Sequence, residues 1–261
     1  MKLRILNTAL LLSTITCGQV MADSLWVNTA NGNTTLDTVE GYDSVIVQSD
    51  ATIGAIKNTE NGTFLNVQAE LTVNSDLEVN QIGLNQYDKQ CVLTVNGDLT
   101  LVKNSKGAGG TLTIAQKETV NVTGTTTVNG GVSLTGKSTL NTSALVINGQ
   151  SSINNSFITA DEVSVNHTFS LMSGSISALD GEGTLTVGAN GNVVQQGVEI
   201  DLETVVKGGQ VTVYKGSFAD VTLSDGGTIN VRGNASAENL TLLDGSLVFN
   251  EGAPLTSAAM L

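Results

Sequence analysis

Short apolar–polar–apolar triplets recur along this chain at intervals of six residues. From residue 120 each triplet starts six residues after the last, with one extra residue between positions 138 and 145. Two apolar positions around a polar one is the two-residue period of a strand buried on one side. The linkers are rich in Gly and Asn, which supply the positive φ angles of tight corners. The triplets are Val120–Val122, Thr126–Val128, Val132–Leu134, Ser138–Leu140, Leu145–Ile147, Ser151–Ile153, Phe157–Thr159, Val163–Val165, Phe169–Leu171 and Ser175–Ser177.

The stretch LTVNGDLTL, residues 93–101, shows what the triplets form. Asn-Gly between alternating apolar residues is a strong hairpin signal. A two-residue hairpin would set Val95 opposite Asp98, and so apolar beside polar on each face. A three-residue loop pairs Val95 with Leu99 consistently, but so does a corner between two faces of a solenoid.

The recurrence favours the solenoid, because three-residue strands are too short for a stable meander yet can stack on the coils above and below. Three faces of about six residues give coils of roughly 18 to 20 residues, about 12 of them, in a rod roughly 55 to 60 Å long. The sequence therefore predicts an all-β parallel β-helix with Leu93, Val95, Leu99 and Leu101 pointing inward. The strand beside Leu93–Val95 should come from a coil 18 to 20 residues away. Two aliphatic residues per triplet favour the right-handed form, since left-handed hexapeptide helices depend on one.

The chain divides into three expected segments. Residues 1–22 resemble a bacterial secretory signal, with a basic start, an apolar stretch and a cleavage site at Val20-Met21-Ala22. A lipoprotein signal would use Cys17 as its modified cysteine, but Thr16 just before it fits the lipoprotein cleavage motif poorly. Residues 23–66, with Trp26, Tyr42 and Phe64, are the least regular and form an N-terminal cap and the first coils. Residues 67–261 form the solenoid, and no later segment is apolar enough to span a membrane.

Charge and cysteine content exclude several classes of function. The formal net charge is −13, and removal of the leader would make it about −15, with Arg232 as the one remaining arginine. Nucleic-acid binding is therefore excluded, because no basic patch could neutralise phosphates. Cys91 would have no partner after cleavage, so neither an intrachain disulfide nor a CxxC site is expected. We interpret Cys91 as a small buried apolar residue, and we expect no cofactor and no metal.

Catalytic equipment is sparse, so we predict that the protein is not an enzyme. His167, the one histidine, falls at a corner between triplets, where we expect a solvated side chain. Asp161 and Glu162, Asp180 and Glu182, and Asp220 and Asp225 fit ordinary turn usage. The alternative is a polysaccharide lyase or glycoside hydrolase, which would need carboxylates from separate coils to converge in one groove. Arg232 or a lysine should then lie beside them.

The leader and the phrases LTVNGDLTL, TTTVNGGVSLTGKSTL and GTLTVGANGNV give the chain a resemblance to the passenger β-helices of bacterial autotransporters and related surface adhesins. The similarity lies in the character of the repeated phrases, and not in a specific motif, over most of residues 67–250. It implies a non-catalytic rod, secreted or held at the bacterial outer membrane, that adheres to glycans or proteins of a host or cell surface. Open end coils would also allow rods to associate end to end.

Overall fold

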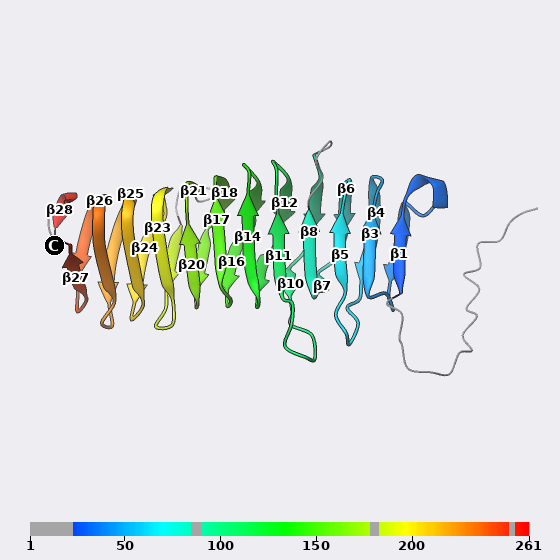
Figure 1. Cartoon of the computed structure of the whole chain (residues 1–261), viewed down its shortest axis with the longest axis horizontal. Coiled ribbons are helices and arrows are strands. Elements are labelled where there is room, and N and C mark those ends of the chain that lie inside the picture. The colour runs from blue at the N-terminus through cyan, green and yellow to red at the C-terminus, as the bar shows by residue number, and fades with distance from the viewer. Residues whose placement is uncertain (1–22, 85–89, 178–182, 251–253, 261) are drawn as a thin grey trace, which may run out of the picture.

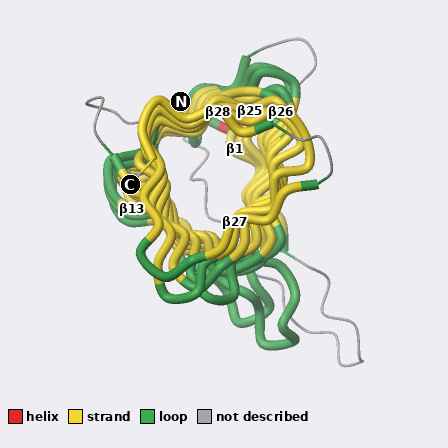
Figure 2. Tube along the Cα trace, turned by 90° about the vertical axis from the view of Figure 1, so that its left-hand side faces the viewer, coloured by secondary structure: helices red, strands yellow, loops and turns green. Residues whose placement is uncertain are grey.

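The structure is a computed structural model that describes residues 23–84, 90–177, 183–250 and 254–260. The chain forms an all-β parallel solenoid of about 12 turns, as the triplets predicted. Figure 1 shows the coils following one another along a straight rod, and Figure 2 shows three faces around the axis. The nearer strands in Figure 1 run upward while the coils advance from right to left, which is the sense of a right-handed coil. The leader expected at residues 1–22 lies outside the described residues.

The strands lie on three faces, and each strand pairs with strands of the neighbouring coils; the first two coils carry strands on two faces, and the third face begins with β7. The N-terminal turn η1 (Thr29–Asn31) is the only helical element among the residues described. Face 1 consists of β1 (Ser24–Val27), β3 (Ser44–Val47), β5 (Phe64–Val67), β8 (Gln81–Leu84), β11 (Thr111–Ile114), β14 (Gly131–Thr135), β17 (Ser151–Asn154), β20 (Thr168–Leu171), the first parts of β23 (Asn192–Ile200), β25 (Gln210–Ser224) and β26 (Thr228–Leu242), and β27 (Ser246–Phe249).

The other two faces follow in the same order along every coil. Face 2 consists of β2 (Thr35–Val39), β4 (Ala51–Ile56), β6 (Glu70–Val73), β9 (Val92–Val95), β12 (Thr119–Val122), β15 (Thr139–Asn141), β18 (Ser156–Thr159), β21 (Gly174–Ser177), the middle of β23, β25 and β26, and the start of β28 (Leu255–Met260). Face 3 consists of β7 (Leu77–Val79), β10 (Leu99–Leu101), β13 (Thr125–Val128), β16 (Ala144–Ile147), β19 (Glu162–Val165), β22 (Thr184–Val187), β24 (Glu203–Lys207) and the ends of β25 and β26.

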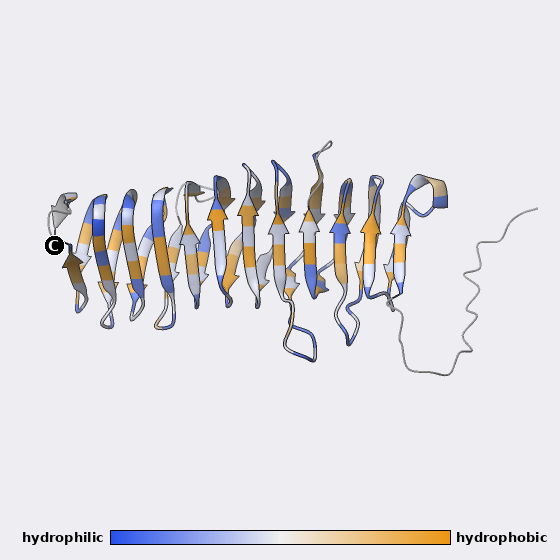
Figure 3. Cartoon of the chain, in the orientation of Figure 1, coloured by the Kyte–Doolittle hydropathy of each residue, from blue (hydrophilic) through white to orange (hydrophobic). Residues whose placement is uncertain are grey.

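The core is a stack of aliphatic side chains inside the coil. Leu93, Val95, Leu99 and Leu101 are all 0% exposed, which confirms the predicted orientation. β9 lies on face 2 and β10 on face 3, and neither pairs with the other, so Asn96-Gly97-Asp98 is a corner and not a hairpin loop. Apolar and polar bands alternate along the strands in Figure 3, as a wall with one buried side requires.

Two of the ten predicted triplets are out of register by one residue. Phe157 was expected inside, but its side chain is 41% exposed, and Ser156 and Ile158 are buried instead. The same shift places Ile176 inside, where the triplet Ser175–Ser177 had put it outside. The reason is the neighbouring coil: Leu140, Ile158 and Ile176 lie side by side on β15, β18 and β21, and this stack fixes the inward position.

The predicted coil length is correct in the middle of the rod and too short near β9. Strands β11, β14, β17 and β20 follow at offsets between 18 and 20 residues, for example Leu112 beside Val132 and Ser152 beside Ser170. Leu93, in contrast, lies beside Leu71 and Val120, which are 22 and 27 residues away. The difference arises because extra residues enter at the corners, including the loop 102–110 between β10 and β11.

Some of the inward positions carry hydroxyl groups, and these pair with one another. Thr126 and Thr142 are buried 2.9 Å apart, and the hydroxyls of Ser138 and Ser156 are 3.1 Å apart. A buried hydroxyl costs little when it is hydrogen-bonded. Small polar residues therefore fill inward positions at a corner without weakening the stack.

Candidate functional surface

The residues that the sequence singled out do not come together in one place. His167 is exposed at the corner between β19 and β20, where its Nδ1 accepts a hydrogen bond from the backbone N–H of Thr168 over 2.8 Å. Arg232 is exposed on β26, several coils away. Cys91 is 0% exposed within the aliphatic core, as interpreted. Trp26 and Phe64 point outward on face 1, and Tyr42 packs half-buried against the core.

The acidic pairs also serve local structure. Asp220 accepts a hydrogen bond from Asn239 Nδ2 over 2.7 Å, and Asp225 lies 3.8 Å from Lys207 Nζ at the surface. Asp180 and Glu182 lie outside the described residues. Within the ranges that the structure describes, no three His, Cys, Asp or Glu side chains lie close enough together to hold a metal ion.

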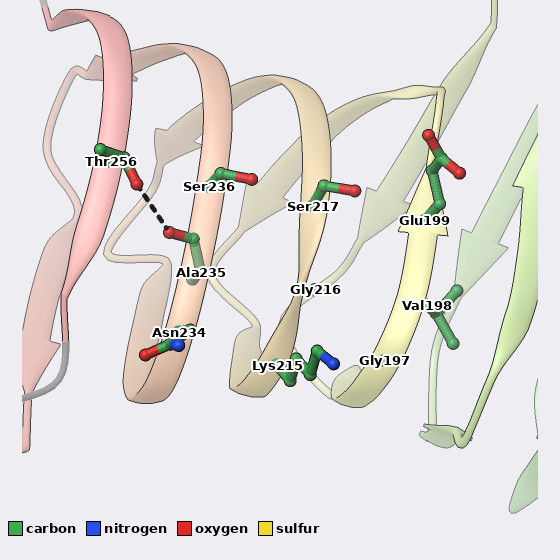
Figure 4. A pocket seen from close by; sticks show the side chains of 10 residues that line it. All are labelled: Gly197, Val198, Glu199, Lys215, Gly216, Ser217, Asn234, Ala235, Ser236 and Thr256. Atoms are coloured by element: carbon green, nitrogen blue, oxygen red, sulfur yellow. Dashed lines mark hydrogen bonds between the residues drawn. The ribbon is translucent and has the colours of Figure 1, made fainter.

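A shallow groove of about 430 Å³ crosses face 2 near its C-terminal end, and Figure 4 shows its lining. Its floor is the column Val198, Gly216 and Ala235, in which the small glycine and alanine leave the hollow. Glu199, Ser217, Ser236 and Thr256 stand in a row on successive coils, because β23, β25, β26 and β28 pair in that register. Lys215 and Asn234 lie at its lower edge.

Buried Gln195 shapes this groove from inside. Its Nε2 donates to the carbonyl oxygens of Val198 and Ser217, 2.6 and 3.2 Å away, and so ties β23 to β25 where the register shifts. A Cβ at Gly216 would lie 2.8 Å from the backbone carbonyl oxygen of Val198 and closer still to Gln195 Nε2, which the two hydrogen bonds hold in place. Glycine is therefore required at this point of the floor, and the hollow is built into the backbone.

A second hollow of about 480 Å³ shares Glu199, Ser217 and Ser236 with the first and adds Asp201 and Glu238. Asp201 and Glu238 come from coils two turns apart, so their backbones are separated by roughly 10 Å along the rod. Carboxylates from separate coils thus line this second hollow, and Lys215 lies in the adjoining groove. Among the described residues, this arrangement is the nearest to the one expected of an enzyme. All of these charged side chains are exposed to solvent.

Face 1 has a different character, because its outward side chains carry no charge. Two outward columns run along it, and neither contains Asp, Glu, Lys or Arg. The central column is Trp26, Ile46, Asn66, Gly83, Thr113, Ser133, Ser152, Ser170, Val194, Thr212, Asn230 and Val248, and the flanking column is Ser24, Ser44, Phe64, Gln81, Thr111, Gly131, Gln150, Thr168, Asn192, Gln210, Thr228 and Ser246. Sequence reasoning missed this face, because the columns become visible only once the register between coils is known.

Charged side chains occupy outward positions on the other two faces. Glu70 and Glu199 lie on face 2, and Glu78, Glu162 and Glu203 lie on face 3. Face 1 also contains two hollows, of about 430 Å³ around Gly83 and about 370 Å³ around Gly131, where glycine leaves a gap between larger neighbours.

These features define the protein as a parallel β-solenoid with one uncharged face and, on another face, a hollow lined by three carboxylates. No family model, no curated protein and no solved structure matches the chain. None of the helical structure in the described part of the chain is long and apolar enough to cross a membrane.

Proposed function

We propose that this chain is an exported bacterial rod that acts at the cell surface as a structural or adhesive protein and not as an enzyme. The observation that supports it is the stack of about 12 turns, which sets the outward side chains of successive coils in rows along the rod. Such a surface offers many weak contacts in register along an extended partner, and solenoids use extended surfaces for binding. The secretory leader expected at residues 1–22 and the resemblance to autotransporter passengers support the location.

The partners that fit this proposal are glycans or proteins of a host or neighbouring cell surface. Hydroxyl and amide side chains along the faces can hydrogen-bond a polar polymer, and the acidic balance disfavours partners with dense negative charge. Weak contacts along one partner would reinforce one another, since a second contact on the same partner forms at a high effective concentration.

The first experiment locates the protein in the cells that make it. Fractionation and protease treatment of intact cells should place the chain in the outer-membrane or secreted fraction and make it accessible from outside. Cells that lack the gene should bind less well to arrays of glycans and matrix proteins. Recovery of the chain only in the cytoplasm would reject the proposal.

The groove on face 2 supports a second candidate, an enzyme that acts on polysaccharides. Its specific basis is the presence of Asp201 and Glu238 in one hollow with Glu199 and near Lys215. The purified protein should be incubated with neutral and acidic polysaccharides, and new reducing ends or unsaturated products should be measured. The rod proposal predicts no turnover. Turnover that is lost in Asp201→Asn or Glu238→Gln, and retained in the face 3 control Glu203→Gln, would establish the enzyme instead.

A further inference from the structure

The absence of charge from face 1 contrasts with the charge of the whole chain. The formal net charge is −13, yet both outward columns of face 1 consist of uncharged side chains along all coils. Two copies of this protein repel each other wherever acidic faces meet, since exposed charges interact over about 8 to 10 Å at physiological salt. Face 1 is the surface on which two copies can approach without opposing like charges.

The size of face 1 suits a dimer. The strands from β1 to β27 span roughly 53 Å at about 4.8 Å per coil, and four residues of strand are roughly 13 Å wide. The face therefore offers about 700 Å² per copy, close to the roughly 800 Å² per partner of a stable interface. A single glycan chain would cover only a narrow part of this surface.

Each end of the central column of face 1 carries an exposed apolar side chain. Trp26 is 46% exposed on the first coil, and Val248 is 48% exposed on the last. Between them the central column is mostly hydroxyl and amide side chains, with Ser133 and Ser152 at its middle. If two rods lie antiparallel, the first coil of one copy meets the last coil of the other at both ends, so each tryptophan covers a valine.

The same arrangement places the hollow at Gly83 opposite a projecting side chain. Gly83 is on the fourth strand of face 1 and Val194 on the ninth, and these positions meet when the order of coils is reversed. The hollow of about 430 Å³ is bordered by Phe64, Gln81, Thr111 and Thr113 and receives the valine from the partner. Self-complementarity of this kind is what a two-fold interface requires, because one surface must fit itself.

We propose that face 1 is the interface of an antiparallel homodimer. The two-fold axis of this dimer runs parallel to the strands and passes between the neighbouring strands β14 and β17. Trp26 then packs on the partner subunit's Val248, and Gly83 receives the partner subunit's Val194. The proposal does not depend on the ligand of the rod, and it assigns self-association to this long face and not to the ends of the solenoid.

Sedimentation equilibrium of the purified protein tests the interface directly. The native chain should have twice its monomer mass at micromolar concentration. Ser152→Asp places two carboxylates on either side of the two-fold axis and should weaken the dimer at least tenfold. Ser164→Asp on face 3 is the matched control, with the same charge change on the same coil, and should leave the mass unchanged.

Charge pairing separates an interface effect from a folding defect. Ser152→Lys alone should also dissociate, but a mixture of Ser152→Asp and Ser152→Lys chains should form a heterodimer. A native chain that is monomeric at all concentrations would overturn the proposal, as would assemblies insensitive to Ser152→Asp, which would indicate association through the ends. A monomer that binds a neutral glycan through face 1 would also overturn it.

Trp26 reports on the antiparallel arrangement, since it is the only tryptophan in the chain. Its emission should shift to the red on dilution and in Ser152→Asp, because the indole loses its cover. Mixing Trp26→Cys chains with Val248→Cys chains under oxidising conditions should give a disulfide-linked heterodimer. A dominant cross-link between two Trp26→Cys chains would instead show parallel rods and reject the proposed geometry.

Discussion

Asn166 donates a hydrogen bond from its side-chain Nδ2 to Oδ1 of Asn148, one coil earlier, over 2.9 Å. Asn148 repeats the contact with Asn129 over 3.0 Å, so three amides form a ladder at the corner between faces 3 and 1. These side chains link successive coils at the corner, in the same way as the backbone hydrogen bonds link them within the faces. The corner is thereby held in the same register as the strands beside it.

Replacing Asn148 by alanine should break the middle of this ladder. Two side-chain hydrogen bonds at an exposed position are lost, so the free energy of unfolding should fall by about 1 kcal/mol. Urea unfolding measures the change. Gln150→Ala, two residues further along and also exposed, is the control and should change stability by less than about 0.5 kcal/mol. Equal losses would contradict a stabilising role for the ladder.

The buried pair Thr126 and Thr142 should respond asymmetrically to valine. Thr142 Oγ1 lies 2.9 Å from the carbonyl oxygens of both Gly124 and Ala144, and it also accepts the hydroxyl of Thr126. Thr142→Val leaves the buried Thr126 hydroxyl unpaired and should cost about 1 to 3 kcal/mol. Thr126→Val removes a donor that serves only this contact and should be nearly neutral. Similar unfolding midpoints for the two variants would show that the pair does not work in this way.

The corrected register of β18 gives a direct test. Ile158 is 0% exposed and Phe157 is 41% exposed. Ile158→Ala should destabilise the chain by about 2 to 5 kcal/mol through the lost burial and the cavity left behind. Phe157→Ser should cost no more than about 1 kcal/mol. The reverse order in chemical denaturation would restore the register that the triplet pattern had predicted.

Stability should depend weakly on pH through Glu40 and Lys57. Lys57 Nζ lies 2.6 Å from Glu40 Oε2, and the hydrogen bond and charge of Lys57 lower the pKa of the Glu40 carboxyl below its usual value of 4.5. A lowered folded-state pKa means that the contribution is present above the unfolded value and is lost as the pH falls through the folded one. Lys57→Gln should raise the pKa of Glu40 in an NMR titration. The stability difference from the native chain should shrink as the pH falls below the usual carboxyl value of 4.5, and also in high salt.

The fold could be predicted because one local rule, two inward aliphatics around an outward polar residue, repeats at nearly every strand. Leu93, Val95, Leu99 and Leu101 follow it without exception. The rule failed at Phe157, where an aromatic residue looks like a core position from its own sequence. Only the stack of Leu140 and Ile176 on the neighbouring coils places Ile158 inside.

The surfaces proposed for function could not be predicted, because each is made by side chains from different coils. Ser152 and Ser170 are neighbours on face 1. The number of residues between such neighbours differs from one coil to the next, so the sequence alone does not reveal which residues lie side by side. The groove on face 2 depends on Gly216, whose requirement comes from Gln195 in the previous coil. Sequence distance does not reveal such contacts until the coil lengths are known.

The loop 102–110 shows that a corner can contain extra residues without changing which strands stack on one another. Leu101 lies beside Val128 across 27 residues, while Val128 lies beside Ile147 across 19. Asn104 closes the loop by accepting the backbone N–H groups of Lys106 and Ala108, and Asn80 anchors its base through the carbonyls of Val102 and Ala108. A foreign peptide inserted at this corner should therefore leave the stacking of the coils unchanged, and the rod should display the peptide at its side.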